Sequence, residues 1–106
     1  MDVETAAKLF GELGNKTRLD ILRLLIKGGR DGLPIGDIHD RLDIPLSTLA
    51  FHLRGLVAAE LIEQEKQGRS VLCRPRFDRI NEAIAFLKEE CCAGAAHARP
   101  RRRNVA

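Results

Sequence analysis

The sequence has no tryptophan, no tyrosine and only four phenylalanines, and no apolar run long enough to span a bilayer. Its first residues are acidic and lack the basic and then apolar pattern of a secretion signal. These absences argue against a membrane-spanning or secreted protein, and we expect a cytoplasmic, reducing location. The three cysteines should therefore be free thiols rather than a disulfide framework.

What is present fits one small globular domain, because 44% of the 106 residues are apolar. The net charge of +3 depends on four arginines near the C-terminus, without which 14 basic residues face 15 acidic ones. Nucleic-acid binding must therefore come from local clustering or from this tail, which would contact phosphates without sequence preference. We expect residues 1–92 to form the domain and residues 93–106 a flexible basic tail.

The spacing of apolar residues predicts four helices in the first sixty residues and a fifth near the C-terminus. Asn15 is a good N-cap for the second helix, and Pro34 is a favourable start for the third. The fourth helix carries four leucines at i, i+3, i+7 and i+10, which we expect to form a buried stripe. The expected helices are residues 3–13, 16–27, 34–42, 46–60 and 77–92, and the stripe is Leu46, Leu49, Leu53 and Leu56.

Between the last two helices the period changes to that of strands. Residues 61–75, "LIEQEKQGRSVLCRP", have β-forming ends around Gln67, Gly68 and Arg69, and they read as a two-stranded hairpin ended by Pro75. The expected fold class is mainly α with a small β-hairpin. Two short helices joined by a tight turn and followed by a hairpin with a basic tip are typical of a winged helix-turn-helix.

In such a fold the second helix of the pair enters the major groove of DNA. Small hydroxyl residues at the start of that helix suit base edges and phosphates, and Arg54 suits a phosphate or a guanine. The alternatives are an ordinary solvated helix face and, for His52, a plain surface histidine. The candidates for DNA contact are Leu46, Ser47, Thr48, Ala50, Phe51, His52 and Arg54 on the helix, and Lys66 and Arg69 at the tip of the hairpin.

The fifth helix carries Ile80, Ile84, Leu87 and Cys91 at spacings of 4, 3 and 4, which is the spacing of a coiled-coil seam. A domain of this size has a marginal core when it is alone. We therefore expect a homodimer that forms through the terminal helices, with Ile80, Ile84 and Leu87 in the interface.

Two runs, "LGNKTRLDILRLL" and "STLAFHLRGLVAAELIEQEKQGRSV", resemble the ArsR/SmtB family of bacterial metal-sensing repressors. The resemblance covers about residues 5–92, and its strongest motifs are Thr17-Arg18, "HLRGL" and the wing signature "GRSV". It implies a homodimeric winged-helix repressor that needs no cofactor, binds operator DNA and leaves it when an inducer binds. It also implies that the helix from Leu46 to Ala59 is the recognition helix and that residues 66–69 form the wing tip.

Two metal sites of that family have no counterpart here. The stretch that matches its Cys-x-Cys pair is "PIGD", which keeps Asp37 but has no thiol. The last helix has no histidine for the family's Asp and His site, so zinc is not expected there. The pair Cys91-Cys92 resembles instead the branch of the family that senses trivalent arsenic through vicinal cysteines.

Trivalent arsenic binds sulfur strongly, so its affinity depends on how many sulfurs converge on it. Side chains of adjacent helical residues diverge by about 100°. Chelation by Cys91 and Cys92 therefore requires the helix to fray after Glu90, and Gly94 is well placed to allow that. Arsenite, which prefers three sulfurs, and methylarsenite, which needs two, both stay open as inducers, and the third ligand is not defined.

Other roles for the thiols also stay open. Cys91 could fill the seam, the pair could sense oxidation or persulfides, or the thiols could be structural in a constitutive DNA-binding protein. Catalysis is not expected, because a helix C-terminus and two neighbouring glutamates disfavour a thiolate. We therefore do not expect an enzyme. Cys73, in the second strand, is expected to be a small buried residue.

Overall fold

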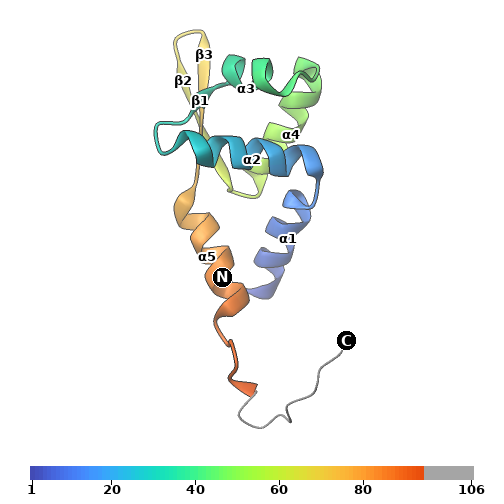
Figure 1. Cartoon of the computed structure of the whole chain (residues 1–106), viewed down its shortest axis with the longest axis vertical. Coiled ribbons are helices and arrows are strands. Elements are labelled where there is room, and N and C mark those ends of the chain that lie inside the picture. Colours follow the sequence, from blue (N-terminus) through green and yellow to red (C-terminus); the bar gives the residue numbers. More distant parts are fainter. Residues whose placement is uncertain (95–106) are drawn as a thin grey trace.

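The computed structural model describes residues 1–94, so most of the expected basic tail lies outside the described residues. The three helices α2, α3 and α4 pack against a small sheet, while α1 and α5 lie side by side at the other end of the molecule (Figure 1). This arrangement is a winged helix-turn-helix, as the sequence predicts. The elements are α1 (Val3–Leu13), α2 (Lys16–Gly28), β1 (Leu33–Pro34), α3 (Ile35–Leu42), α4 (Leu46–Ala58), β2 (Ile62–Gln67), β3 (Ser70–Pro75) and α5 (Phe77–Lys88).

Short polar side chains set where the first two helices begin. Asp2 accepts a hydrogen bond of 2.8 Å from the backbone N–H of Thr5, and Asn15 accepts one of 3.1 Å from the backbone N–H of Arg18. Aspartate and asparagine are preferred N-caps because they satisfy N–H groups that have no partner inside the helix. The expected cap at Asn15 is therefore confirmed.

The sheet has three antiparallel strands in the order β1-β3-β2, one strand more than the expected hairpin. The wing, formed by β2 and β3, turns through Gly68 and Arg69, and Gly68 has a φ of +62°. A glycine at the first central position is typical of the type II′ turn that joins two-residue hairpins. The expected turn is therefore confirmed.

The additional strand, β1, is only two residues long, and this is why periodicity does not reveal it. Leu33 pairs with Cys73 of β3. Just before the strand, Gly32 has a φ of +79°, and a Cβ atom there would lie 2.4 Å from the carbonyl oxygen of Cys73. Glycine is therefore required where the chain approaches β3.

Three of the four leucines of the expected stripe are buried, namely Leu49, Leu53 and Leu56. The prediction is wrong for the fourth leucine, because the side chain of Leu46 is 55% exposed. Leu46 is the first residue of α4, so it precedes the part of the helix that packs on α2 and β2. It lies instead along a surface groove between α3 and the wing.

Two helices end earlier than expected. The helix α4 stops at Ala58, because Glu60 has a left-handed backbone with a φ of +60°. The helix α5 stops at Lys88 rather than at residue 92. Cys91 and Cys92 therefore follow α5 instead of forming its last turn. Across residues 1–94, no helix combines the length and apolar character needed to cross a membrane.

Candidate nucleic-acid interface and thiol site

The candidates on α4 share one surface with different degrees of exposure. Ser47, Thr48 and Arg54 are exposed, as are the apolar Leu46 and Phe51. The two remaining candidates, Ala50 and His52, are half-buried. The exposed set combines hydroxyl groups, a guanidinium and two large apolar side chains, which together can contact phosphates, base edges and thymine methyl groups.

The first turn of α4 leaves its backbone donors available. Pro45 occupies the N-cap position, and no side chain caps the helix there. The first N–H groups of a helix have no partner within the helix, and they favour an anion such as phosphate. The start of α4 thus offers backbone donors in addition to Ser47 and Thr48.

The tip of the wing supplies the basic part of the same surface. Lys66 and Arg69 are exposed, and within residues 1–94 no carboxylate forms an ion pair with either of them. Arg69 lines the groove that also contains Leu46 and His39. The structure therefore brings the start of α4 and the wing tip to one face.

His52 has a partner inside the protein. Its Nδ1 accepts a hydrogen bond of 3.1 Å from Nε of Arg18 in α2. Burial, and after it the charge of Arg18, lowers the pKa of His52 below its usual value. The ring is therefore neutral when it accepts this bond. No local pattern predicts this role for Arg18, and the signal that points to the residue is the Thr17-Arg18 motif.

The two thiols at the C-terminal end of the domain converge. The Sγ atoms of Cys91 and Cys92 lie 3.2 Å apart, and both residues are exposed. A disulfide bond would be about 2.05 Å long, so these are two separate thiols. Cys92 has a left-handed backbone with a φ of +67°, which is uncommon for a residue with a side chain. The turn that aligns the thiols is therefore at Cys92 itself rather than at Gly94.

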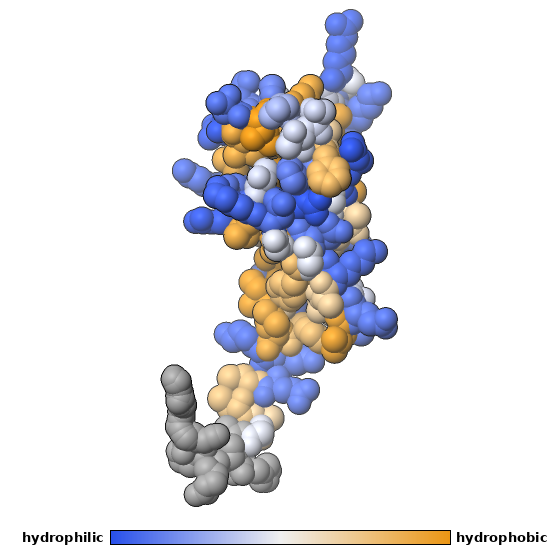
Figure 2. All heavy atoms as spheres, turned by 90° about the vertical axis from the view of Figure 1, so that its right-hand side faces the viewer, coloured by the Kyte–Doolittle hydropathy of each residue, from blue (hydrophilic) through white to orange (hydrophobic). Residues whose placement is uncertain are grey.

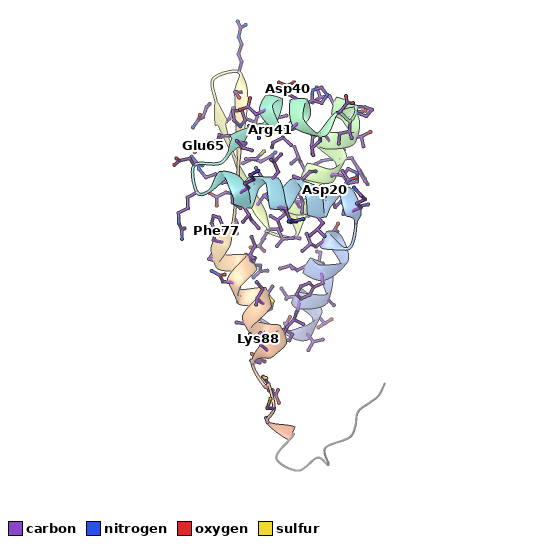
Figure 3. All side chains as sticks on the ribbon, viewed as in Figure 1. Asp20, Asp40, Arg41, Glu65, Phe77 and Lys88 are labelled. Carbon is purple, nitrogen blue, oxygen red and sulfur yellow. The ribbon has the colours of Figure 1, made fainter. Side chains whose placement is uncertain are left out.

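This placement corrects the expected seam. Cys91 lies beyond Lys88, the last residue of α5, so it does not continue the helical spacing of Ile80, Ile84 and Leu87. Figure 3 labels Lys88, and on the segment that follows it yellow sulfur atoms lie close together. The hydrogen bond with Cys92, and after it burial, raises the pKa of Cys91. A raised pKa disfavours the reactive thiolate that a catalytic cysteine needs.

The thiol pair fits one thiophilic ion. A bond between sulfur and a soft ion is about 2.3 Å long, as in zinc thiolate sites, so one ion can contact two sulfurs that are 3.2 Å apart. Within the described part of the chain, no three His, Cys, Asp or Glu residues gather as a metal site. The pair therefore supplies two donors.

Cys73 has a different environment. It is fully buried on β3, and its Sγ accepts a hydrogen bond of 3.5 Å from Nε2 of Gln64. Burial raises the pKa of the Cys73 thiol. The prediction that Cys73 is a small buried residue is confirmed.

An apolar groove lies between α1, α2 and α5. It has a volume of about 210 Å³ and includes Phe10, Leu19, Ile26, Ile80 and Ile84. Of the α5 residues in the expected seam, Ile84 and Leu87 are 51% and 66% exposed, whereas Ile80 is half-buried. Figure 2 shows apolar side chains gathered over the lower half of the body, where α1 and α5 lie in Figure 1.

Known proteins with similar sequences are regulators of transcription. Residues 13–65 match the family model of a helix-turn-helix domain. The chain is 34% identical over 86 residues to an uncharacterised HTH-type transcriptional regulator of Methanocaldococcus jannaschii, a match that covers 81% of this chain and 94% of the relative.

Solved structures give the same result. An ArsR-like transcriptional regulator from Rhodococcus sp. RHA1 has a TM-score of 0.76 and 26% identity, and the match covers 89% of this chain and 86% of that chain. A homodimeric winged helix-turn-helix DNA-binding domain from Mycobacterium bovis has a TM-score of 0.66 and 22% identity, with 94% of this chain and 90% of that chain covered. At 22% identity, the match to the Mycobacterium bovis domain shows a similar fold and nothing more.

The fold and its exposed, uncapped α4 define a winged DNA-binding protein of the class that regulates transcription. The chain belongs to the helix-turn-helix family of transcriptional regulators. Its fold is that of the ArsR-like members of this family. The relatives reported above are named for the regulation of transcription or for DNA binding.

Proposed function

We propose that this chain is a homodimeric transcriptional repressor that is released from operator DNA when trivalent arsenic binds Cys91 and Cys92. Arsenic is then an inducer and not a resident cofactor. The observation that carries the proposal is the 3.2 Å separation of two exposed sulfurs. Exposed adjacent thiols that converge in this way can share one soft ion, whereas thiols kept for structure are usually buried, as Cys73 is.

Operator binding is supported by what α4 and the wing present on one face. The uncapped start of α4 and the hydroxyl groups of Ser47 and Thr48 suit phosphates and base edges. Exposed Phe51 offers an apolar contact to a thymine methyl group. Lys66 and Arg69 on the wing would add phosphate contacts that do not depend on sequence.

Dimerisation is supported by the apolar surface of α5. Ile84 and Leu87 are large apolar side chains that are mostly exposed in the single chain, and they border a groove lined almost entirely by apolar residues. A second copy of the chain would remove this surface from water. The spacing of these residues is that of a helical seam, so α5 is expected to pack against its symmetry mate.

Sensing and DNA binding are connected through α5. Only Glu89 and Glu90 separate the thiols from Lys88, so an ion that fixes Cys91 and Cys92 also restrains the end of the helix that carries the seam. A rotation between the two protomers changes the distance between their recognition helices, which must match one DNA turn of about 34 Å. A coupling of about 1–3 kcal/mol would weaken operator binding by roughly 5- to 150-fold.

The test begins with an operator selected by the wild-type chain from a random duplex library. Release of the fluorescent operator is then titrated side by side with arsenite, methylarsenite, zinc and peroxide. The proposal predicts release by the arsenicals, with methylarsenite at least as effective as arsenite, because two sulfurs are in place. Zinc should have little effect, since two further nitrogen or sulfur donors are missing from the described residues around the pair.

An oxidation sensor is the second candidate, because sulfurs this close to each other can also react with peroxide. Two thiols and one peroxide would give a disulfide and two molecules of water. In the same titration, release by peroxide with no response to either arsenical would favour this second function. Operator binding that no ligand reverses would indicate a constitutive DNA-binding protein.

A further inference from the structure

One arginine joins three helices under the proposed DNA-binding face. Arg18 belongs to α2, and its side chain is only 12% exposed. Its Nη1 forms an ion pair with the carboxylate of Glu12 in α1 and donates a 3.4 Å hydrogen bond to the Glu12 backbone carbonyl. Its Nε donates to Nδ1 of His52 in α4 at 3.1 Å. A single guanidinium therefore bonds to both α1 and α4.

The same guanidinium also contacts the neighbour of His52. Its Cζ lies 5.2 Å from the ring centroid of Phe51, within the range of a cation–π contact. The rings of Phe51 and His52 are 5.3 Å apart and inclined by 66°, in an edge-to-face arrangement. Arg18 thus holds two consecutive side chains of α4, one of them exposed on the face proposed to contact DNA.

A glycine in α4 provides the space for this contact. A Cβ atom at Gly55 would lie 2.6 Å from Cζ of Arg18. Glycine inside a helix is less favourable than alanine, because it loses more backbone freedom on folding. Gly55 therefore makes the helix less stable, but it leaves room for the Arg18 guanidinium beside the recognition helix.

We propose that Arg18 is a positioning residue for sequence recognition, which sets the orientation of Phe51 and His52 on α4 and fixes them relative to α1. The inference rests on the proposed function, because it requires that α4 read operator DNA. A planar guanidinium can bond to Glu12 and His52 and stack on Phe51 at once. A lysine would carry the same charge but has a single ammonium, so it could not keep all three contacts.

Two substitutions test this role from opposite sides of the contact. Arg18→Lys keeps the charge, and Gly55→Ala keeps Arg18 but places a methyl group where the guanidinium lies. Gly11→Ala is the matched control, because it makes the same change on a helix where a Cβ would have no atom within 4 Å. Circular dichroism and melting curves establish that each variant is folded.

The readout is the ratio of affinities for the selected operator and for a scrambled duplex of equal length, at one salt concentration. Both Arg18→Lys and Gly55→Ala should lower this ratio by about tenfold, because one misplaced base contact costs that much discrimination. Binding to the scrambled duplex should change by no more than about twofold, because phosphate contacts supply most of it. Gly11→Ala should keep the wild-type ratio.

The outcomes separate this inference from the proposed function. A wild-type ratio in both variants would overturn the positioning role alone. An equal loss of binding to the operator and to the scrambled duplex would also overturn it, since that pattern marks a merely structural residue. If the wild-type chain itself selected no operator, the proposed function would fail and the inference with it.

Discussion

Ile84 and Leu87 lie one turn apart on α5, and both side chains are more than half exposed, next to an apolar groove. Figure 3 shows the helix that carries them between the labelled Phe77 and Lys88. In a single small chain such exposure is unfavourable, and a second copy would cover it.

We expect Leu87→Asp to raise the dissociation constant of the dimer by at least about 100-fold, because it places a charge in an apolar seam. Sedimentation equilibrium measures the change. Ala85→Asp is the control, because it adds the same charge at an exposed position of α5 outside the seam spacing. A monomeric Leu87→Asp protein that bound the operator with full affinity would contradict the proposed dimer architecture.

The N-cap of α2 gives a prediction on stability. Asn15→Ala should lower the free energy of unfolding by about 1 kcal/mol, because the backbone N–H of Arg18 loses its partner. Asn15→Asp should have little effect, since aspartate caps equally well. Urea unfolding at one fixed protein concentration measures both. Equal stability of the alanine variant and the wild type would show that the cap contributes nothing.

The contact between Arg18 and His52 predicts a pH dependence of stability. Because the folded-state pKa of His52 lies below the usual 6.5, the unfolded chain binds the proton more readily. The stability that His52 contributes is therefore complete above about pH 6.5 and is lost as the pH falls through the folded pKa. Arg18 of α2 is the charged group facing the ring, and Glu12 of α1 pairs with Arg18.

His52→Gln removes this titration while keeping a polar side chain. The difference in melting temperature between the wild type and His52→Gln should shift against the wild type as the pH falls from about 7.5 to about 5. Other titrating groups are common to both proteins, so they cancel in the difference. A difference that stays constant over this range would contradict a hydrogen bond that depends on a neutral His52.

Basic residues on α4 and on the wing should differ in what they contribute to DNA binding. Lys66→Ala should weaken binding to the operator and to a scrambled duplex equally, and lower the salt slope by about one. Arg54→Ala should weaken operator binding as well, by about 1–3 kcal/mol if Arg54 contacts a guanine. Fluorescence anisotropy over a range of salt concentrations measures both. A change in operator preference on loss of Lys66 would contradict a phosphate contact.

Helix positions and the wing could be predicted because local signals determine them. Asn15 caps α2, Pro34 precedes α3, and Gly68 allows the tight turn of the wing. The spacing of the leucines wrongly predicts that Leu46 is buried, because spacing reports which residues share a face and not how far the core extends along it. The strand β1 is too short to show any period.

The sequence predicts which residues make up the candidate thiol site, but not how they are arranged in space. The pair Cys91-Cys92 is visible in the sequence, yet its 3.2 Å approach depends on the end of α5 at Lys88 and on the left-handed backbone of Cys92. The cluster at Arg18 depends on three helices meeting, and Arg18 and His52 are 34 positions apart in the sequence. No local sequence pattern indicates a contact between two residues so far apart in the chain.

The central claim is tested most directly by titrating methylarsenite into the complex of the labelled operator with wild-type protein, Cys92→Ser or Cys73→Ser. Serine is nearly isosteric with cysteine but is a poor ligand for a soft ion, so folding and operator binding should persist. We predict that the wild type and Cys73→Ser release the operator, and that Cys92→Ser, like Cys91→Ser, does not. Release from Cys92→Ser at the wild-type concentration of methylarsenite would contradict the vicinal pair as the inducer site.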